Sequence, residues 1–165
     1  RTGVLVEDLA DVIKQVNATE FPGVPVWAIV CDHDAEGRAT LEKHMGMPTR
    51  AASKAVRTGV EAVEARLRVR EDGRPGLFVV QDAMISRDPV LDEAKKPCGL
   101  IEEIPGYVWA ETTSGLKEEP VKKNDHAADS LRYGVMFLDA SDPLKVHSPV
   151  NARPQRTPVL SRKVG

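Results

Sequence analysis

The sequence predicts an α/β domain in which helices pack against short buried strands. Segments whose apolar residues recur at helical spacing alternate with short, unbroken apolar runs, and turn residues separate the two kinds of segment. Such alternation is typical of a sheet layered with helices. A chain of 165 residues with 41% apolar and 29% charged side chains is long enough, and ordinary enough in composition, for one domain with its own core.

The first third of the chain predicts a helix, a buried strand and a second helix. A turn at residues 21–23 leads into the apolar run 26–31, which suits a strand buried on both faces and stops at Asp32. A helix from Ala35 to about Met45 follows. The first helix is indicated by apolar residues at helical spacing: Leu5, Leu9, Val12, Ile13 and Val16.

The middle of the chain predicts another helix and another strand. Gly46 and Pro48 close the preceding helix, and a short extended piece brings Lys54 to the start of the next one. A turn at residues 71–76 then precedes the apolar run 77–80, which reads as a second buried strand. The helix between them is indicated by Val56, Val60, Val63 and Leu67.

The last third predicts a short helix, an edge strand, a loop and a long helix. Asp88 and Pro89 open the short helix, which extends to about Lys96. Residues 104–109 predict a bend and an edge strand, because proline is unsuited to a central strand. We expect residues 111–123 to form an exposed loop beside the long helix of residues 124–138.

Composition also bears on location and on cysteine chemistry. No run of about 18 apolar residues occurs, and the first residues lack the pattern of a signal peptide, so we expect a soluble, intracellular protein. Cys31 and Cys98 form no CxxC pair and predict neither a zinc site nor a disulfide framework.

Charge is unevenly distributed along the chain. Residues 143–165 contain five Lys or Arg and no acidic residue, whereas residues 1–142 carry 18 basic and 25 acidic side chains. An acidic body argues against a nucleic-acid binder that relies on a broad positive face. It fits a site whose carboxylates need cations.

Two carboxylates and an imidazole stand at the opening of the last helix. Asn124 can cap this helix, Asp125 and Asp129 then lie on one face, and His126 lies beside Asp129. Such hard, oxygen-rich ligands suit Mg²⁺ or Mn²⁺. The same residues also fit a structural role, since acidic residues in a first turn offset the helix dipole and a His/Asp pair three apart can be a surface contact.

Asp32 is the second candidate, because the carboxyl end of a buried strand is where open α/β sheets usually place an active-site crevice. Its alternative role, shared with Asp34, is to cap the helix that follows. Candidate contacts to phosphate groups are Lys54, Arg57, Lys122 and Lys123, although isolated basic residues of this kind are more often simply solvated.

With Asp32 ending a strand, Lys54 before an amphipathic helix and residues 124–133 opening the last helix, the chain resembles the nuclease domain of phage terminase large subunits, the DNA-packaging proteins of tailed bacteriophages. The resemblance covers residues 1–142, includes residues 106–109, and is to terminases of the actinobacteriophage type. It implies a ribonuclease H-like mixed sheet flanked by helices. Residues 143–165 are expected to form a basic, Pro-rich and flexible tail.

The resemblance implies a metal-dependent endodeoxyribonuclease that cuts concatemeric phage DNA by two-metal phosphodiester hydrolysis with Mg²⁺ or Mn²⁺. Asp32 matches one of the acidic ligands of that family. Asp125, His126 and Asp129 match its cluster at the start of the final helix. The implied partners are double-stranded DNA, the terminase ATPase domain and small subunit, and the portal protein, in the cytoplasm of an infected or lysogenic bacterial host, with no membrane association.

The sequence departs from that family at its beginning. No buried strand precedes the first helix, so the family's first-strand Asp has no counterpart, and Asp8 and Asp11 inside that helix are poor substitutes. We therefore expect an N-terminally incomplete domain that lacks its first strands and is weak or inactive alone. The GxxxxGK[ST] phosphate loop of the family's ATPase motor is also absent.

Two other interpretations stay open. Residues 32–37 also resemble the DxDxxG turn of the Toprim metal-dependent nucleases, but that fold needs a Glu at the end of an earlier strand, and the upstream candidate, Glu7, lies in a predicted helix. The other is a non-catalytic, nuclease-like remnant that docks packaging partners through its basic tail.

Overall fold

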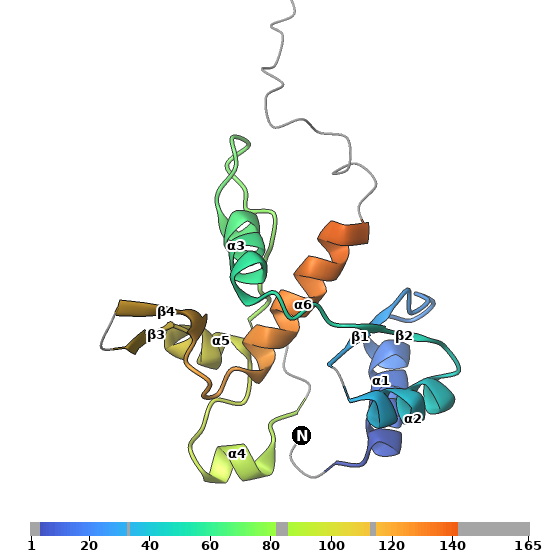
Figure 1. Cartoon of the computed structure of the whole chain (residues 1–165). Helices are drawn as coiled ribbons and strands as arrows, with labels where there is room; N and C mark the ends of the chain where they lie inside the picture. The colour runs from blue at the N-terminus through green and yellow to red at the C-terminus, as the bar shows by residue number, and fades with distance from the viewer. Residues whose placement is uncertain (1–3, 33, 82–85, 113–114, 142–165) are drawn as a thin grey trace, which may run out of the picture.

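Helix α6 (His126–Ser141) crosses the middle of the structure, a computed structural model that describes residues 4–32, 34–81, 86–112 and 115–141. Helix α3 (Val56–Leu67) packs against one side of α6, and strand β1 (Ile29–Cys31) lies against another (Figure 1). The predicted long helix is therefore confirmed, and it begins two residues later than the sequence suggests. Ala128 and Val135 are buried, as the helical spacing of the apolar residues requires.

Strand β1, helix α2 (Ala35–Met45) and strand β2 (Thr49–Ala51) form a parallel strand–helix–strand unit, in which Ile29 pairs with Thr49. Asp34 caps α2, because its Oδ1 accepts hydrogen bonds from the backbone N–H groups of Glu36 and Gly37. Gly46 ends the helix in the left-handed conformation, with φ of 69°. The predicted helix is confirmed, whereas only three residues of the predicted strand 26–31 pair with β2.

A hydrogen-bonded cluster fastens β2 to α2. Thr49 donates from its backbone N–H and its hydroxyl to Oε1 of Glu42, at 2.8 and 2.7 Å, and its hydroxyl accepts from Nε of Arg38 at 2.9 Å. The hydrogen bonds from Thr49 hold the pKa of Glu42 below its ordinary value. This cluster fixes the strand that leads to Lys54.

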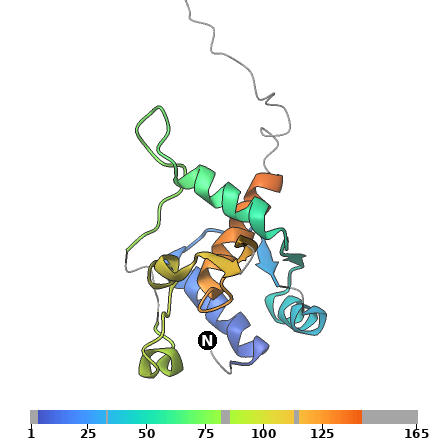
Figure 2. The same cartoon turned by 60° about the vertical axis from the view of Figure 1, so that its left-hand side comes forward.

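Helix α1 (Val6–Glu20) packs on α2, as both views in Figures 1 and 2 show. Asp88 caps the short helix α4 (Pro89–Glu93), which is shorter than predicted. Helix α5 (Leu100–Glu103) continues directly into the 3₁₀ turn η1 (Ile104–Gly106), and α5 packs against α6.

Two expectations about strands are wrong. Residues 77–80 form no strand in the described structure, and Phe78 and Val80 are 68% and 69% exposed, so this apolar run is not buried. The predicted loop 111–123 instead contains most of an antiparallel hairpin, made by β3 (Trp109–Thr112) and β4 (Gly115–Pro120) with a bulge between Trp109 and Glu111. The edge strand expected near residue 109 is half of that hairpin.

The described strands form two separate two-stranded sheets, one parallel and one antiparallel. Helices and short strands together give the α/β class that the sequence predicts. No helix in the described part of the chain combines the length and apolar character that a membrane crossing needs. The predicted tail, residues 143–165, lies outside the described residues.

Helices α3 and α6 cross at a glycine. A Cβ atom added to Gly59 would lie 2.5 Å from Cγ of Arg132 and 2.7 Å from Sδ of Met136, far inside van der Waals contact. Only glycine allows the two helices to approach this closely. The stem of Arg132 packs in the space so provided, which fixes the side chain that the site below depends on.

Candidate active site

Asp32, His126 and Asp129 line one pocket of about 260 Å³, together with Val30, Ser130 and Tyr133. Asp32 is the first residue after β1, and the residues at positions 126, 129, 130 and 133 lie on one face of α6 because they are spaced by three and four. Two of the predicted site segments, nearly a hundred residues apart, therefore meet where the end of β1 reaches the first turns of α6.

Asp129 presents its two carboxylate oxygens differently. Its Oδ1 accepts hydrogen bonds from the Tyr107 hydroxyl at 3.0 Å and from Nε and Nη2 of Arg132 at 3.3 and 3.1 Å. Its Oδ2 has a single weak contact among the described residues, the Tyr133 hydroxyl at 3.5 Å. Oδ1 is thus saturated by donors, and Oδ2 is the oxygen available to a ligand.

Arg132 is a fixed cation behind Asp129. Its side chain is only 3% exposed, its Nη1 lies 3.5 Å from the carbonyl oxygen of Ser53, and its guanidinium lies 4.6 Å from the centre of the Tyr133 ring. A buried guanidinium that pairs with a carboxylate on the preceding turn cannot move away without leaving that carboxylate unpaired. Arg132 was not among the residues that sequence reasoning selected, because a buried arginine and an exposed one look alike in a sequence.

Asp32 has a cation of its own. Lys54, three residues after β2, forms an ion pair with Oδ1 of Asp32, and its Nζ lies 5.6 Å from the centre of the Tyr133 ring. The side chains of Lys54 and Asp32 are 45% and 63% exposed. The parallel pairing of β1 with β2 brings these two residues to the same end of the sheet.

Glu103 caps the helix that carries His126 and Asp129. Its Oε2 accepts hydrogen bonds from the backbone N–H groups of Ala127 and Ala128 at 2.7 and 3.0 Å, and the residue is 5% exposed. A carboxylate at this position satisfies two of the unpaired donors of the first helical turn and is favoured by the helix dipole. The capping role assigned to Asn124 is wrong, because α6 begins at His126 and Asn124 lies one residue before the capping position; a carboxylate from α5 accepts the hydrogen bonds instead.

The remaining candidates, Asp125, Arg57, Lys122 and Lys123, are not among the residues that line this pocket. Asp125 is half-buried just before α6, accepts the backbone N–H of Asp129 through its own carbonyl, and is not among the pocket-lining residues. Arg57 forms an ion pair with Glu61 at 3.1 Å. Lys122 and Lys123 are exposed in the short connection between β4 and α6.

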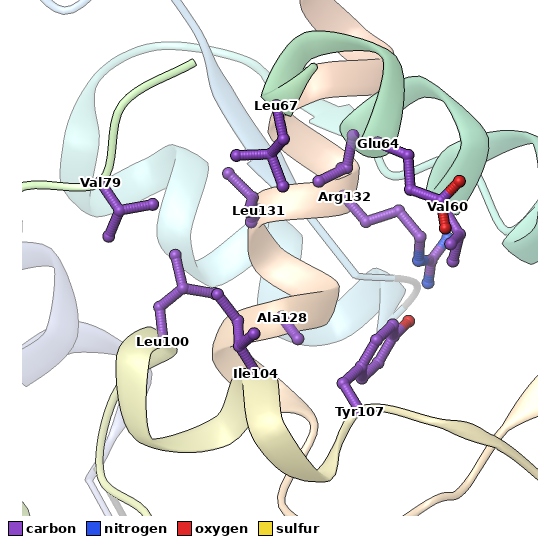
Figure 3. A pocket seen from close by; sticks show the side chains of 11 residues that line it. Val60, Glu64, Leu67, Val79, Leu100, Ile104, Tyr107, Ala128, Leu131 and Arg132 are labelled. Atoms are coloured by element: carbon purple, nitrogen blue, oxygen red, sulfur yellow. The ribbon is translucent and has the colours of Figure 1, made fainter. Parts of the chain in front are cut away.

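The opposite face of α6 borders an apolar pocket of about 200 Å³. Figure 3 shows Leu67, Val79 and Leu100 toward one end of it, and Tyr107 and Arg132, with Val60 and Glu64, toward the other. Tyr107 and Arg132 therefore separate the apolar pocket from the carboxylate of Asp129. The aliphatic lining comes from four segments: Val60, Val63 and Leu67 of α3, Val79 in the connection before α4, Leu100 and Ile104 of α5 and η1, and Leu131 of α6.

Burial and the hydrogen bond to Asp129 raise the pKa of Tyr107 to about 12 from its ordinary value of 10.0. The folded state therefore favours the protonated phenol. We expect the resulting stability to be present in full below pH 10 and to be lost as pH rises toward 12, by about 2 kcal/mol. Urea unfolding across this range should show the loss in the parent chain, and Tyr107→Phe should show a smaller dependence on pH. If the free energy of unfolding falls equally with pH in the two proteins, this prediction is wrong.

The donors around the pocket are of the type that hard divalent cations prefer: carboxylate oxygens from Asp32 and Asp129 and an imidazole from His126. Within the described ranges, however, no three His, Cys, Asp or Glu side chains are close enough together to hold one ion as they stand. The two carboxylates are drawn toward Lys54 and Arg132 instead.

Searches against protein-family models, curated proteins and solved structures find no match to this chain.

Proposed function

We propose that the chain is the nuclease part of a viral DNA-packaging terminase: a Mg²⁺- or Mn²⁺-dependent endodeoxyribonuclease with a ribonuclease H-like fold. The observation that supports this best is the shared pocket, in which Asp32 at the carboxyl end of β1 meets His126 and Asp129 at the start of α6. The parallel unit of β1, α2 and β2 also suits a sheet of that type. Double-stranded DNA is the substrate, and the ATPase domain, the small subunit and the portal protein are the partners, in the cytoplasm of the bacterial host.

The metal ligands in this proposal are Asp32, Oδ2 of Asp129 and the imidazole of His126, with Asp125 beside them. Divalent ions supply a more acidic water and neutralise charge on the leaving oxygen when they are bound at such a site. Tyr107 and Arg132 hold Oδ1 of Asp129, which orients that carboxylate and leaves Oδ2 as the oxygen available to a ligand. Lys54, Lys122 and Lys123 provide positive charge for phosphates around an otherwise acidic body.

Asp34 favours this proposal over the Toprim alternative. A DxDxxG metal turn would use both Asp32 and Asp34, but Oδ1 of Asp34 already accepts two backbone hydrogen bonds as the cap of α2. The possible third acidic residue, Glu7, lies in the first turn of α1.

Nicking of supercoiled plasmid DNA tests the proposal. We expect the parent chain, which the sequence predicts to be weak alone, to convert supercoiled to open circular DNA slowly in Mn²⁺ and not at all in EDTA. Asp32→Asn and Asp129→Asn should each lower the rate by about 100-fold or more, because metal activation is worth several kcal/mol and each 1.36 kcal/mol is tenfold in rate.

Asp8→Asn is the matched control, since Asp8 is an exposed aspartate in the first turn of α1. It should nick DNA like the parent. Nicking that survives in both pocket variants, or that falls equally in all three, would overturn the assignment of the site.

A second candidate, a non-catalytic docking module, is favoured by the amount of exposed apolar surface. Phe78, Val80, Ile101 and Ile104 are all at least 44% exposed, and the apolar pocket of Figure 3 opens beside α5. A docking module would not cut plasmid DNA in any divalent cation, and the pocket variants would behave like the parent.

A further inference from the structure

The two pocket carboxylates differ in how firmly their cations are held. Arg132 is buried, reaches Asp129 with two nitrogens and stacks near the Tyr133 ring. Lys54 reaches Asp32 with one ammonium at the end of a flexible stem, and both side chains are substantially exposed. Exposed ion pairs of this kind are weak, while a buried guanidinium stays with its carboxylate. One cation of the site is thus permanent and the other is replaceable.

Lys54 also lies where a divalent ion bound in the pocket would compete with it for Asp32. Its ammonium contacts an Asp32 oxygen and lies beside the Tyr133 ring, and Asp32 and Tyr133 both line the pocket with His126 and Asp129. Any divalent ion that engages Asp32 from the pocket must share that carboxylate with the ammonium or displace it. Two cations at one carboxylate repel each other, and displacement removes most of that cost.

We propose that Lys54 is the exchangeable cation of this site: it neutralises Asp32 in the metal-free protein, yields that carboxylate to a divalent ion, and then binds a phosphate of the DNA strand. This inference rests on the proposed function, because it takes the pocket to be a metal site. In this proposal Lys54 competes with the metal ion for Asp32. Arg132 has a different role, because it stays with Asp129 whether or not the metal is bound.

Repulsion between a divalent ion and an ammonium a few ångströms apart near the surface is modest, since water and salt screen it. Removing the ammonium should therefore tighten metal binding by about three- to tenfold. The same change should raise the DNA concentration needed for half-maximal nicking, because a phosphate contact is lost.

The test is a Mn²⁺ titration followed by the electron paramagnetic resonance signal of free Mn²⁺, with the full chain and no DNA. Lys54→Met removes the charge at nearly constant stem length, and Lys54→Arg keeps the charge. Arg57→Met is the matched control, because it removes one positive charge from the first turn of α3, where the guanidinium pairs with Glu61. Asp32→Asn reports whether the measured ion is bound at this pocket.

We expect Lys54→Met to bind Mn²⁺ three- to tenfold more tightly than the parent, with Lys54→Arg and Arg57→Met close to the parent and Asp32→Asn much weaker. If the parent binds Mn²⁺ through Asp32 but Lys54→Met does not bind it more tightly, or Arg57→Met gains as much, the role of Lys54 is wrong and the metal site stands. If neither the parent nor Lys54→Met binds Mn²⁺, the proposed function and this inference both fail.

Discussion

Arg132→Leu is expected to lower the free energy of unfolding by about 3–5 kcal/mol, the usual cost of removing one member of a buried ion pair. The change leaves Asp129 with the Tyr107 hydroxyl as its main partner and withdraws the group that lies near the Ser53 carbonyl. It also empties part of the crossing between α3 and α6, where the Arg132 stem packs on Gly59. Urea denaturation followed by circular dichroism would measure the loss.

Two further variants identify the cause of that loss. Arg132→Lys keeps the charge but loses the planar guanidinium that reaches Oδ1 of Asp129 with two nitrogens. Its free energy of unfolding should therefore lie between those of the parent and Arg132→Leu. Arg57→Leu removes an exposed arginine from the neighbouring helix and should change stability little. Equal losses for Arg57→Leu and Arg132→Leu would show that the buried pair contributes nothing specific.

Glu103→Ala should lower the free energy of unfolding by about 2–3 kcal/mol, because it leaves the buried backbone N–H groups of Ala127 and Ala128 without an acceptor. The first turn of α6 should loosen in the same variant, and with it the residues that face the pocket. Amide hydrogen exchange provides the direct measurement. Exchange at positions 127 and 128 should become much faster, while exchange near Val135 should become faster only by the amount that the loss of global stability accounts for.

Glu102→Ala is the control, since the neighbouring carboxylate belongs to an exposed pair with Arg87 and does not reach α6. It should destabilise the protein less and leave the amides of Ala127 and Ala128 protected. Glu103→Gln keeps one acceptor oxygen and should recover part of the lost stability. If the amides exchange at the parental rate in Glu103→Ala, the proposed cap is not needed for the helix.

The segments that sequence reasoning located well are those with local signals. Asp34 and Gly46 mark the two ends of α2, and the structure places those ends where the sequence did. The meeting of Asp32 with His126 and Asp129 could be anticipated because strand ends and helix starts are recognisable and open sheets gather them at one edge. The roles of Glu103, Tyr107 and Arg132 could not, since each depends on a tertiary contact that leaves no periodic pattern.

The errors have physical causes as well. The apolar run 77–80 has strand propensity, but a strand also needs a neighbour, and no backbone hydrogen bond joins these residues to another strand within the described part of the chain. Residues 111–123 were expected to be a loop because they are polar and charged. Glu111, Gly115 and Glu119 are exposed in this hairpin, and a strand with one side in water carries polar residues, so polarity did not distinguish loop from strand there.

The exposed run also affects how the protein will behave at high concentration. Residues 76–81 form a six-residue window without a charge or a proline, rich in β-branched and aromatic side chains, with Phe78 and Val80 facing water. Segments of this composition are the ones that stack into cross-β aggregates when nothing covers them. Arg74 and Asp82 are the nearest charges in the sequence on either side, so Phe78→Lys or Val80→Lys is the natural first substitution for keeping the chain monodisperse.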